Sequence, residues 1–351
     1  MGISNIKGEK GRKRYMKNKL KDIPKIELHC HLDGSVRTET MYELLLEQGE
    51  ITPMDIKQFE EMVRVKDECK SLNEYLEKFK YPLKIMQRKE NLERITYELL
   101  EDLSLQNVKY VEIRFAPFLH MEEGLTFDEV VESVLNGMER AKKDLSILSN
   151  AILICMRHED VEESIRVVEY GEKYLGKGVV AVDLAGNEAD FPPEIHQKAF
   201  QLAYEKGYRI TVHAGETGIE DNITKSIELL HANRIGHGIA AIKDPKVMEI
   251  IKDKGISLEM CPISNLQTKA IKSIEDYPIR NFLHRELNIT VNTDNITVSN
   301  TSLQREYELL MDKLGFSLDE IYGLIDNSIK AAFLSENDKN KLRNIIFKEL
   351  R

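Results

Sequence analysis

The sequence predicts a (β/α)8 barrel, the TIM-type α/β fold, with a helical lid insertion between the first and second strands. Eight short runs of apolar and β-branched residues alternate with longer amphipathic segments along the 351 residues. No internal repeat and no linker rich in proline, glycine or serine divides the chain, so we expect one catalytic domain over residues 23–351. An open doubly wound sheet is the alternative, but no G-x-G-x-x-G motif follows an early run.

The eight runs are the expected strands. Several are almost entirely apolar, as in "GVVAVDLA" and "NAILICM", which is typical of strands covered on both faces. A helical pattern lies between most of them, for example over residues 193–206, and Gly207 follows where a helix C-cap is expected. In chain order the expected strands are residues 25–31, 110–116, 151–156, 179–184, 209–213, 234–237, 257–260 and 290–292.

The connection over residues 32–107 is too long for a simple crossover. It contains the segment "SLNEYLEKF", in which four apolar residues share one helix face. This stripe consists of Leu72, Tyr75, Leu76 and Phe79. It either packs onto the barrel as ordinary core or forms a lid over the barrel mouth, and the sequence leaves both interpretations open.

Charge and cysteine content restrict the class of protein. The net charge is −10, yet residues 1–21 hold eight lysines and arginines against one acid. We therefore expect residues 1–22 to form a basic, disordered arm, and the acidic remainder makes a nucleic-acid partner unexpected. The four cysteines form no C-x-x-C pair, which fits a reducing cytoplasm. No stretch approaches the ~18 apolar residues of a membrane span.

Polar residues gather where the expected strands end. His29 and His31 end the first strand, His213 ends the fifth, and Asp294 follows the eighth. A barrel brings the carboxyl ends of its strands to one rim, so three imidazoles and a carboxylate should converge there. These ligands suit Zn²⁺, and a cysteine-free set at a barrel mouth favours a catalytic zinc over a structural one.

Two titratable residues at the same rim are left for acid–base work. Glu216 follows the fifth strand, and His237 ends the sixth. Glu216 can act as an acid and His237 as a base toward a water molecule bound to the metal. The sequence therefore predicts a hydrolytic metal site with one zinc ion per chain.

Seven separated motifs resemble those of the adenosine deaminases, a branch of the metal-dependent amidohydrolase-type barrels. The resemblance covers about residues 23–335, in the order and spacing of that family. It implies zinc-dependent deamination of adenosine and 2′-deoxyadenosine to inosine or deoxyinosine and ammonia. The motifs are "IELHCHLDGS", "VEIRFAP", "VAVDLAGNE", "VHAGE", "RIGHG", "CPISN" and "NTDN".

The resemblance also implies a role for each matching residue. The zinc ligands correspond to His29, His31, His213 and Asp294, and His31 is also expected to touch the substrate. Glu216 looks like the proton donor to purine N1, and His237 like the residue that orients and deprotonates the attacking water. Asp33 resembles the residue that binds the ribose 5′-hydroxyl, and Gly186 the backbone donor to N3.

One position departs from the commonest family pattern. Many members have a second aspartate where this chain has Asn295. Purine N7 only accepts a hydrogen bond, and an asparagine amide donates one without having to be protonated, so Asn295 is interpreted as a working substitute. Adenine or another aminopurine nucleoside is the alternative substrate. The pair Asp33–Gly34 favours a nucleoside, because the adenine-specific branch tends to have Glu-Gly there.

Overall fold

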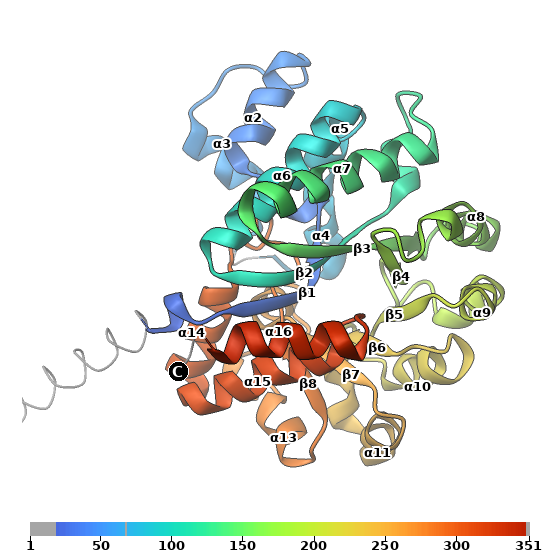
Figure 1. The fold of residues 1–351 in the computed structure, drawn as a ribbon, viewed down its shortest axis with the longest axis vertical. Helices are drawn as coiled ribbons and strands as arrows, with labels where there is room; N and C mark the ends of the chain where they lie inside the picture. Colours follow the sequence, from blue (N-terminus) through green and yellow to red (C-terminus); the bar gives the residue numbers. More distant parts are fainter. Residues whose placement is uncertain (1–18, 67–68, 349–351) are drawn as a thin grey trace, which may run out of the picture.

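Eight parallel strands form a barrel in the computed structural model, which describes residues 19–66 and 69–348 (Figure 1). Each strand pairs with the next in chain order, which confirms the (β/α)8 prediction, and all eight expected strands are present with small differences at their ends. The strands are β1 Lys25–His31, β2 Val108–Phe115, β3 Leu148–Met156, β4 Val179–Ala185, β5 Arg209–Ala214, β6 Arg234–His237, β7 Ser257–Met260 and β8 Asn288–Val291.

The residues after β8 close the barrel against β1. The backbone N–H of His31 donates to the carbonyl of Asp294 at 2.8 Å, and the N–H of Asp294 donates to the carbonyl of His29 at 2.8 Å. Two expected metal ligands on β1 are therefore joined to a third through the backbone. The same two backbone hydrogen bonds therefore close the barrel and bring these three residues together at its rim.

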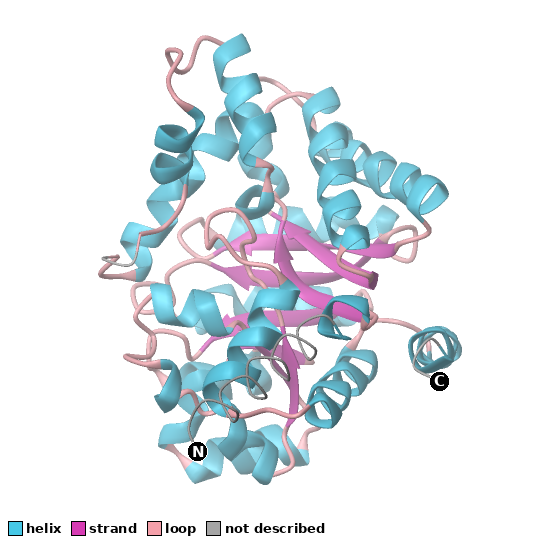
Figure 2. Cartoon of the chain, turned by 90° about the vertical axis from the view of Figure 1, so that its left-hand side faces the viewer, coloured by secondary structure: helices cyan, strands magenta, loops and turns pink. Residues whose placement is uncertain are grey.

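Helices connect the strands and surround them (Figures 1 and 2). The expected helix over residues 193–206 is a 3₁₀ turn, Pro193–His196, continued by α9, and Gly207 adopts a φ of +84° just beyond it. The helices outside the long first connection are α7 Phe127–Leu145, α8 Val161–Gly171, α9 Gln197–Glu205, α10 Glu220–Leu229, α11 Pro245–Asp253, α12 Pro262–Gln267, α13 Ile279–His284, α14 Leu303–Leu314, α15 Leu318–Ala331 and α16 Glu336–Lys348.

The long first connection is a group of helices on one side of the strands (Figure 2). Its short segments follow one another without a strand between them. The helices are α2 Thr38–Glu47, α3 Ile56–Val63, α4 Leu72–Leu76, α5 Lys80–Ile85 and α6 Lys89–Leu105. The longest of them, α6, packs beside α7 on the barrel wall.

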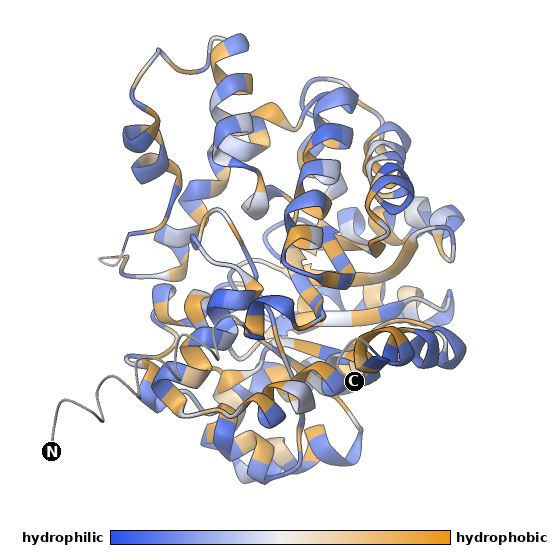
Figure 3. Ribbon diagram, turned by 60° about the vertical axis from the view of Figure 1, so that its left-hand side comes forward, coloured by the Kyte–Doolittle hydropathy of each residue, from blue (hydrophilic) through white to orange (hydrophobic). Residues whose placement is uncertain are grey.

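The core lies inside the barrel and between the strands and the outer helices. Side chains such as Ile152, Val182, Val212 and Leu258 are fully buried. The outer helices mix hydrophilic and hydrophobic residues along their length, as expected for helices with one face on the barrel (Figure 3). Among the described residues, no helix is both long and apolar enough to cross a bilayer.

Most of the expected basic arm, residues 1–18, lies outside the described residues. Residues 19–22 are helical, and Leu20 among them is fully buried in the core. The expectation of disorder therefore does not hold for these four residues, because Leu20 gives the segment an apolar contact that the count of charges did not reveal.

Candidate active site and metal centre

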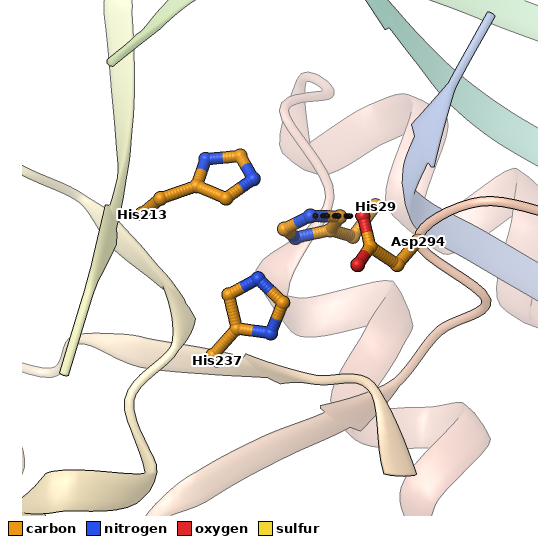
Figure 4. A group of neighbouring side chains, drawn as sticks. All are labelled: His29, His213, His237 and Asp294. Carbon is orange, nitrogen blue, oxygen red and sulfur yellow. Dashed lines mark ion pairs between the residues drawn. The ribbon is translucent and has the colours of Figure 1, made fainter. Parts of the chain in front are cut away.

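Histidine and aspartate side chains converge at the carboxyl end of the barrel. His29 on β1, His213 on β5, His237 on β6 and Asp294 after β8 offer ligand atoms that all lie within 4.8 Å of one another. Figure 4 shows these four side chains pointing toward a common centre. The rim therefore holds a group of residues that could bind a metal ion.

His31 belongs to the same group. Its Nε2 lies 3.2 Å from Nε2 of His213 and 3.4 Å from Oδ1 of Asp294. The structure thus brings together all four expected ligands, His29, His31, His213 and Asp294, and places His237 beside them. Burial lowers the pKa of His31 well below its ordinary value, which keeps this imidazole neutral and able to ligate.

The hydrogen bonds of the imidazoles fit a metal ion. Nδ1 of His29 lies 2.7 Å from Glu259, and Nδ1 of His213 lies 3.1 Å from Asp183, so each Nδ1–H donates to a carboxylate. Each Nε2 is then left with a lone pair directed into the site. Nε2 of His29 is buried without a hydrogen-bond partner, and the two Nε2 atoms of His31 and His213 face each other. A bound cation satisfies all three nitrogens.

A buried guanidinium joins the two carboxylates behind these histidines. Arg114 donates to Asp183 and to Glu259, in both cases at 2.9 Å. Burial alone would raise the pKa of each acid, but Arg114 together with Arg234 holds that of Glu259 well below its usual range, and His213 with Arg114 does the same for Asp183. Both carboxylates therefore remain charged and fix the orientation of their histidines.

The sequence interpretation missed Asp183 and Glu259. A usable signal exists, because each acid stands between two apolar residues inside a strand, in "AVDLA" and "SLEM". A carboxylate on a strand buried on both faces needs a partner. Ser264 is a third omission, since its hydroxyl donates to Oδ2 of Asp294 at 2.5 Å.

The two expected acid–base residues lie next to each other. Oε2 of Glu216 is 3.6 Å from Nε2 of His237. The hydroxyl of Thr268 donates to Oε1 of Glu216 at 2.9 Å, and Nδ2 of Asn265 lies 2.9 Å from Nδ1 of His237. Neighbours on α12 and just after it therefore orient both groups, and only the motif "CPISN" marked this region in the sequence.

Backbone strain accompanies two of the site residues. His237 and Asp294 each have a φ of +62°, a left-handed conformation that residues other than glycine rarely adopt. Such strain persists only where the surrounding structure imposes it. Here it turns the ends of β6 and β8 so that both side chains reach the common centre.

A cavity of about 420 Å³ opens onto this cluster. Every expected site residue except His29 contributes to its lining: His31, Asp33, Gly186, His213, Glu216, His237, Asp294 and Asn295. Apolar side chains such as Leu119, Ile154 and Met156 form part of the wall. A mostly apolar cavity with a few convergent polar groups is the usual form of a small-molecule site.

Gly34 makes room for Asn295. A Cβ atom at position 34 would lie 1.8 Å from Oδ1 of Asn295, so only glycine allows the amide to occupy its place. That amide oxygen is buried and has no hydrogen-bond partner. Burial also raises the pKa of the neighbouring Asp33 to about 7. Both side chains are polar groups that a ligand could satisfy.

The apolar stripe, which lies on α4 and the 3₁₀ turn Glu77–Phe79 that follows it, covers the cavity. Leu72, Tyr75, Leu76 and Phe79 all belong to its lining, which favours the lid interpretation. The lid is fastened at two places: the hydroxyl of Tyr75 lies 2.7 Å from that of Ser299, and Nδ2 of Asn187 donates to Oδ1 of Asn73 at 3.1 Å. Tyr75 also packs with Val65, Cys69 and Val298 in a cluster separate from the main core.

We expect Phe79→Ala to weaken substrate binding more than folding. Phe79 is partly exposed and lines the cavity, so its loss removes apolar contact with a ligand and leaves the main core intact. KM should rise about tenfold with little change in Tm. Steady-state kinetics and thermal denaturation measure both. Tyr170→Ala, at an exposed aromatic residue on α8, is the control. A large fall in Tm with unchanged KM would support the core interpretation instead.

Sequence comparison shows the family to which the chain is related. The family model described as adenosine deaminase matches residues 24–349. An adenosine deaminase of Clostridium kluyveri is 50% identical over 324 residues, which is 92% of this chain and 93% of that protein. An adenosine deaminase of Clostridium acetobutylicum is 47% identical over 328 residues, covering 93% and 98% of the two chains.

Solved structures with the same fold include deaminases of related substrates. An adenine deaminase of Arthrobacter aurescens superimposes with a TM-score of 0.86 at 26% identity, covering 93% of this chain and 99% of that one. The N6-methyl-AMP deaminase of Arabidopsis thaliana gives a TM-score of 0.84 at 29% identity, covering 95% and 98%. An amidohydrolase of Burkholderia ambifaria with bound zinc gives 0.86 at 25%, covering 95% and 92%.

Proposed function

This chain belongs to the adenosine deaminase family and is a deaminating hydrolase, and we propose that it converts adenosine and 2′-deoxyadenosine to inosine or deoxyinosine and ammonia. One observation carries the proposal. Glu216 and His237 lie 3.6 Å apart and line one cavity, next to His29, His31, His213 and Asp294, which could hold a metal. An acid, a base and a metal site are what hydrolysis of an aromatic C–N bond requires.

We propose zinc as the metal, with one ion per chain held by His29, His31, His213 and Asp294. The donor set of neutral imidazoles and one carboxylate is typical of catalytic zinc sites. When bound, Zn²⁺ supplies hydroxide near neutral pH, because it lowers the pKa of water from 15.7 toward about 7. The carboxylates of Glu259 and Asp183 keep two of the imidazoles in the ligating tautomer.

The protein's own residues activate the purine. C6 of adenine belongs to an aromatic ring and carries a poor leaving group, so attack there needs a more electrophilic carbon. Glu216 donates a proton to N1, which draws electrons from C6. His237 orients the attacking water and takes its proton. His237 then gives the proton to the amino group, which leaves C6 as ammonia, and the proton of the new C6 hydroxyl returns to Glu216 as the carbonyl of inosine forms.

The remaining cavity residues hold the nucleoside in place. The Asp33 carboxyl and His31 bind the 5′-hydroxyl side of the ribose, the N–H of Gly186 donates to N3, and the Asn295 amide donates to N7. The cavity position of all four residues supports these roles.

Charge at the cavity favours a nucleoside over a nucleotide. Among the described residues, the lining contains four acids, Asp33, Asp190, Glu216 and Asp294, and no lysine or arginine. A 5′-phosphate would face these acids without a compensating cation. The cavity therefore lacks the positive charge that binding of a nucleoside monophosphate requires. Free adenine would leave the ribose side of the cavity unfilled.

Ammonia release from a panel of substrates tests the proposal. We expect adenosine and 2′-deoxyadenosine to be turned over efficiently. AMP should show a kcat/KM at least about 10²-fold lower because of like-charge repulsion. Adenine should be similarly poor because it lacks the contacts of the ribose. Preference for adenine would establish the alternative substrate, and inactivity toward the whole panel would contradict the proposed reaction.

We also propose that the protein acts in the cytoplasm on this small-molecule substrate. All four cysteines, Cys30, Cys69, Cys155 and Cys261, are free thiols and are buried, which fits a reducing compartment.

A further inference from the structure

Glu188 is a buried acidic residue that has no role in the reaction steps proposed above. It follows β4 in the motif "LAGNE" and is only 2% exposed. Its Oε2 accepts from the backbone N–H of Gly215 at 2.9 Å, and its Oε1 accepts from that of Thr217 at 2.7 Å. The hydroxyl of Thr217 and the amide of Asn222 add bonds of 3.1 Å and 3.0 Å.

The two backbone donors belong to the residues on either side of Glu216. Glu188 therefore bridges the peptide turn that carries the acid, with one oxygen on each side of it. Gly215 has a φ of +75°, so this turn departs from an extended strand at the point where Glu188 binds it. On its other side, the Glu216 side chain is held by Thr268. The acid is thus fixed from both its backbone and its carboxylate.

A second feature links this bridge to the substrate. Gly186, two residues before Glu188, lines the cavity with a φ of +109° and is the expected donor to purine N3. The single loop over residues 186–188 therefore meets one edge of the base with its backbone. Through the side chain of Glu188, the same loop also binds the turn that carries Glu216, the proposed proton donor to N1. The expected N3 contact and the expected N1 contact therefore both depend on this loop.

We propose that Glu188 is a positioning residue for proton transfer to N1, acting through the turn that carries Glu216. This inference rests on the proposed deamination reaction. Both oxygens are required, because two backbone N–H groups point at them and a buried donor without an acceptor is unfavourable. Without the bridge the turn relaxes, and displacement of a catalytic group by about 1 Å can cost about 10²-fold in rate.

Glu188→Gln tests the bridge with the least change in size. The glutamine amide has one accepting oxygen, and its NH2 group would face the second backbone N–H, so one side of the turn is released. We expect kcat for adenosine to fall about 10²-fold with full metal content. The Kd for 1-deazaadenosine, which has C–H in place of N1, should stay within about twofold because this analogue accepts no proton.

The matched control is Glu194→Gln, a carboxylate-to-amide change on the surface of the next turn. Glu194 is exposed and pairs with Lys225 at 2.8 Å, away from the cavity lining. Its kcat should equal that of the wild type. Turnover by the wild type is measured first: its absence would contradict the proposed reaction, whereas an active wild type with a fully active Glu188→Gln variant would contradict only the role of Glu188.

A double-mutant cycle separates positioning from a general structural role. If Glu188 acts through Glu216, adding Glu188→Gln to Glu216→Gln should cause no further loss of kcat. A multiplicative loss, or weaker binding of 1-deazaadenosine in the single variant, would overturn the inference. Should Glu188→Gln not fold, Thr217→Val replaces it. That change removes only one hydroxyl donor and should lower kcat about threefold in the wild type and not at all beside Glu216→Gln.

Discussion

His213→Ala is expected to abolish both metal binding and deamination. His213 is one of four groups that converge at the barrel rim, and its Nε2 lies 3.2 Å from that of His31. Removing one imidazole leaves too few ligands for tight binding, and the Asp183 carboxylate keeps Arg114 but loses its imidazole partner. The zinc content measured by elemental analysis should fall from about one equivalent per chain to near zero, and kcat should fall by about 10³-fold or more.

Two matched histidine variants distinguish a ligand from a base. His31→Ala should also lose the metal. His237→Ala should keep about one equivalent and still lose most of its activity, because His237 is assigned to the attacking water. The structure makes this comparison necessary, since a ligand atom of His237 lies within 4.8 Å of those of His29, His213 and Asp294. Full metal in His213→Ala, or an empty site in His237→Ala, would show that the assignment is wrong.

The residues predicted from the sequence are those that end strands. A parallel barrel places all strand ends at one rim, so His29, His213 and Asp294 could be brought together without knowing any distance. Asp183 and Glu259 could not be paired in this way. Asp183 lies two residues before the end of β4, and Glu259 lies one residue before the end of β7. The guanidinium of Arg114, which joins them, comes from β2. Their roles depend on which side chains meet inside the barrel, and strand spacing alone does not give that.

The long first connection shows a different limit. The spacing of Leu72, Tyr75, Leu76 and Phe79 identified one apolar face correctly, but the same face suits the barrel wall and a lid equally well. Only the bond from Tyr75 to Ser299 and the position of the stripe over the cavity distinguish them. Leu20 is a similar case, because a single buried leucine within a basic segment carries no periodic signal.

Glu216→Gln is expected to separate binding from chemistry. Glutamine keeps an N–H that can donate a hydrogen bond to N1, but it has no acidic proton to transfer. The change leaves the side chain the same size and still able to accept from Thr268. We therefore expect the variant to retain about one equivalent of metal, to bind adenosine, and to lose about 10²–10⁴-fold in kcat.

Asp221→Asn provides the comparison for this change, since it also converts an acid to an amide and lies at the exposed start of α10. Its kcat should remain that of the wild type. The two variants should differ in kcat because of where the two acids lie. Glu216 lines the cavity 3.6 Å from His237. A water held by His237 could therefore attack C6 of a purine whose neighbouring N1 is protonated by Glu216. Near wild-type turnover by Glu216→Gln would require another acid, and among the described cavity residues Asp33, with a pKa of about 7, would be the group to replace next.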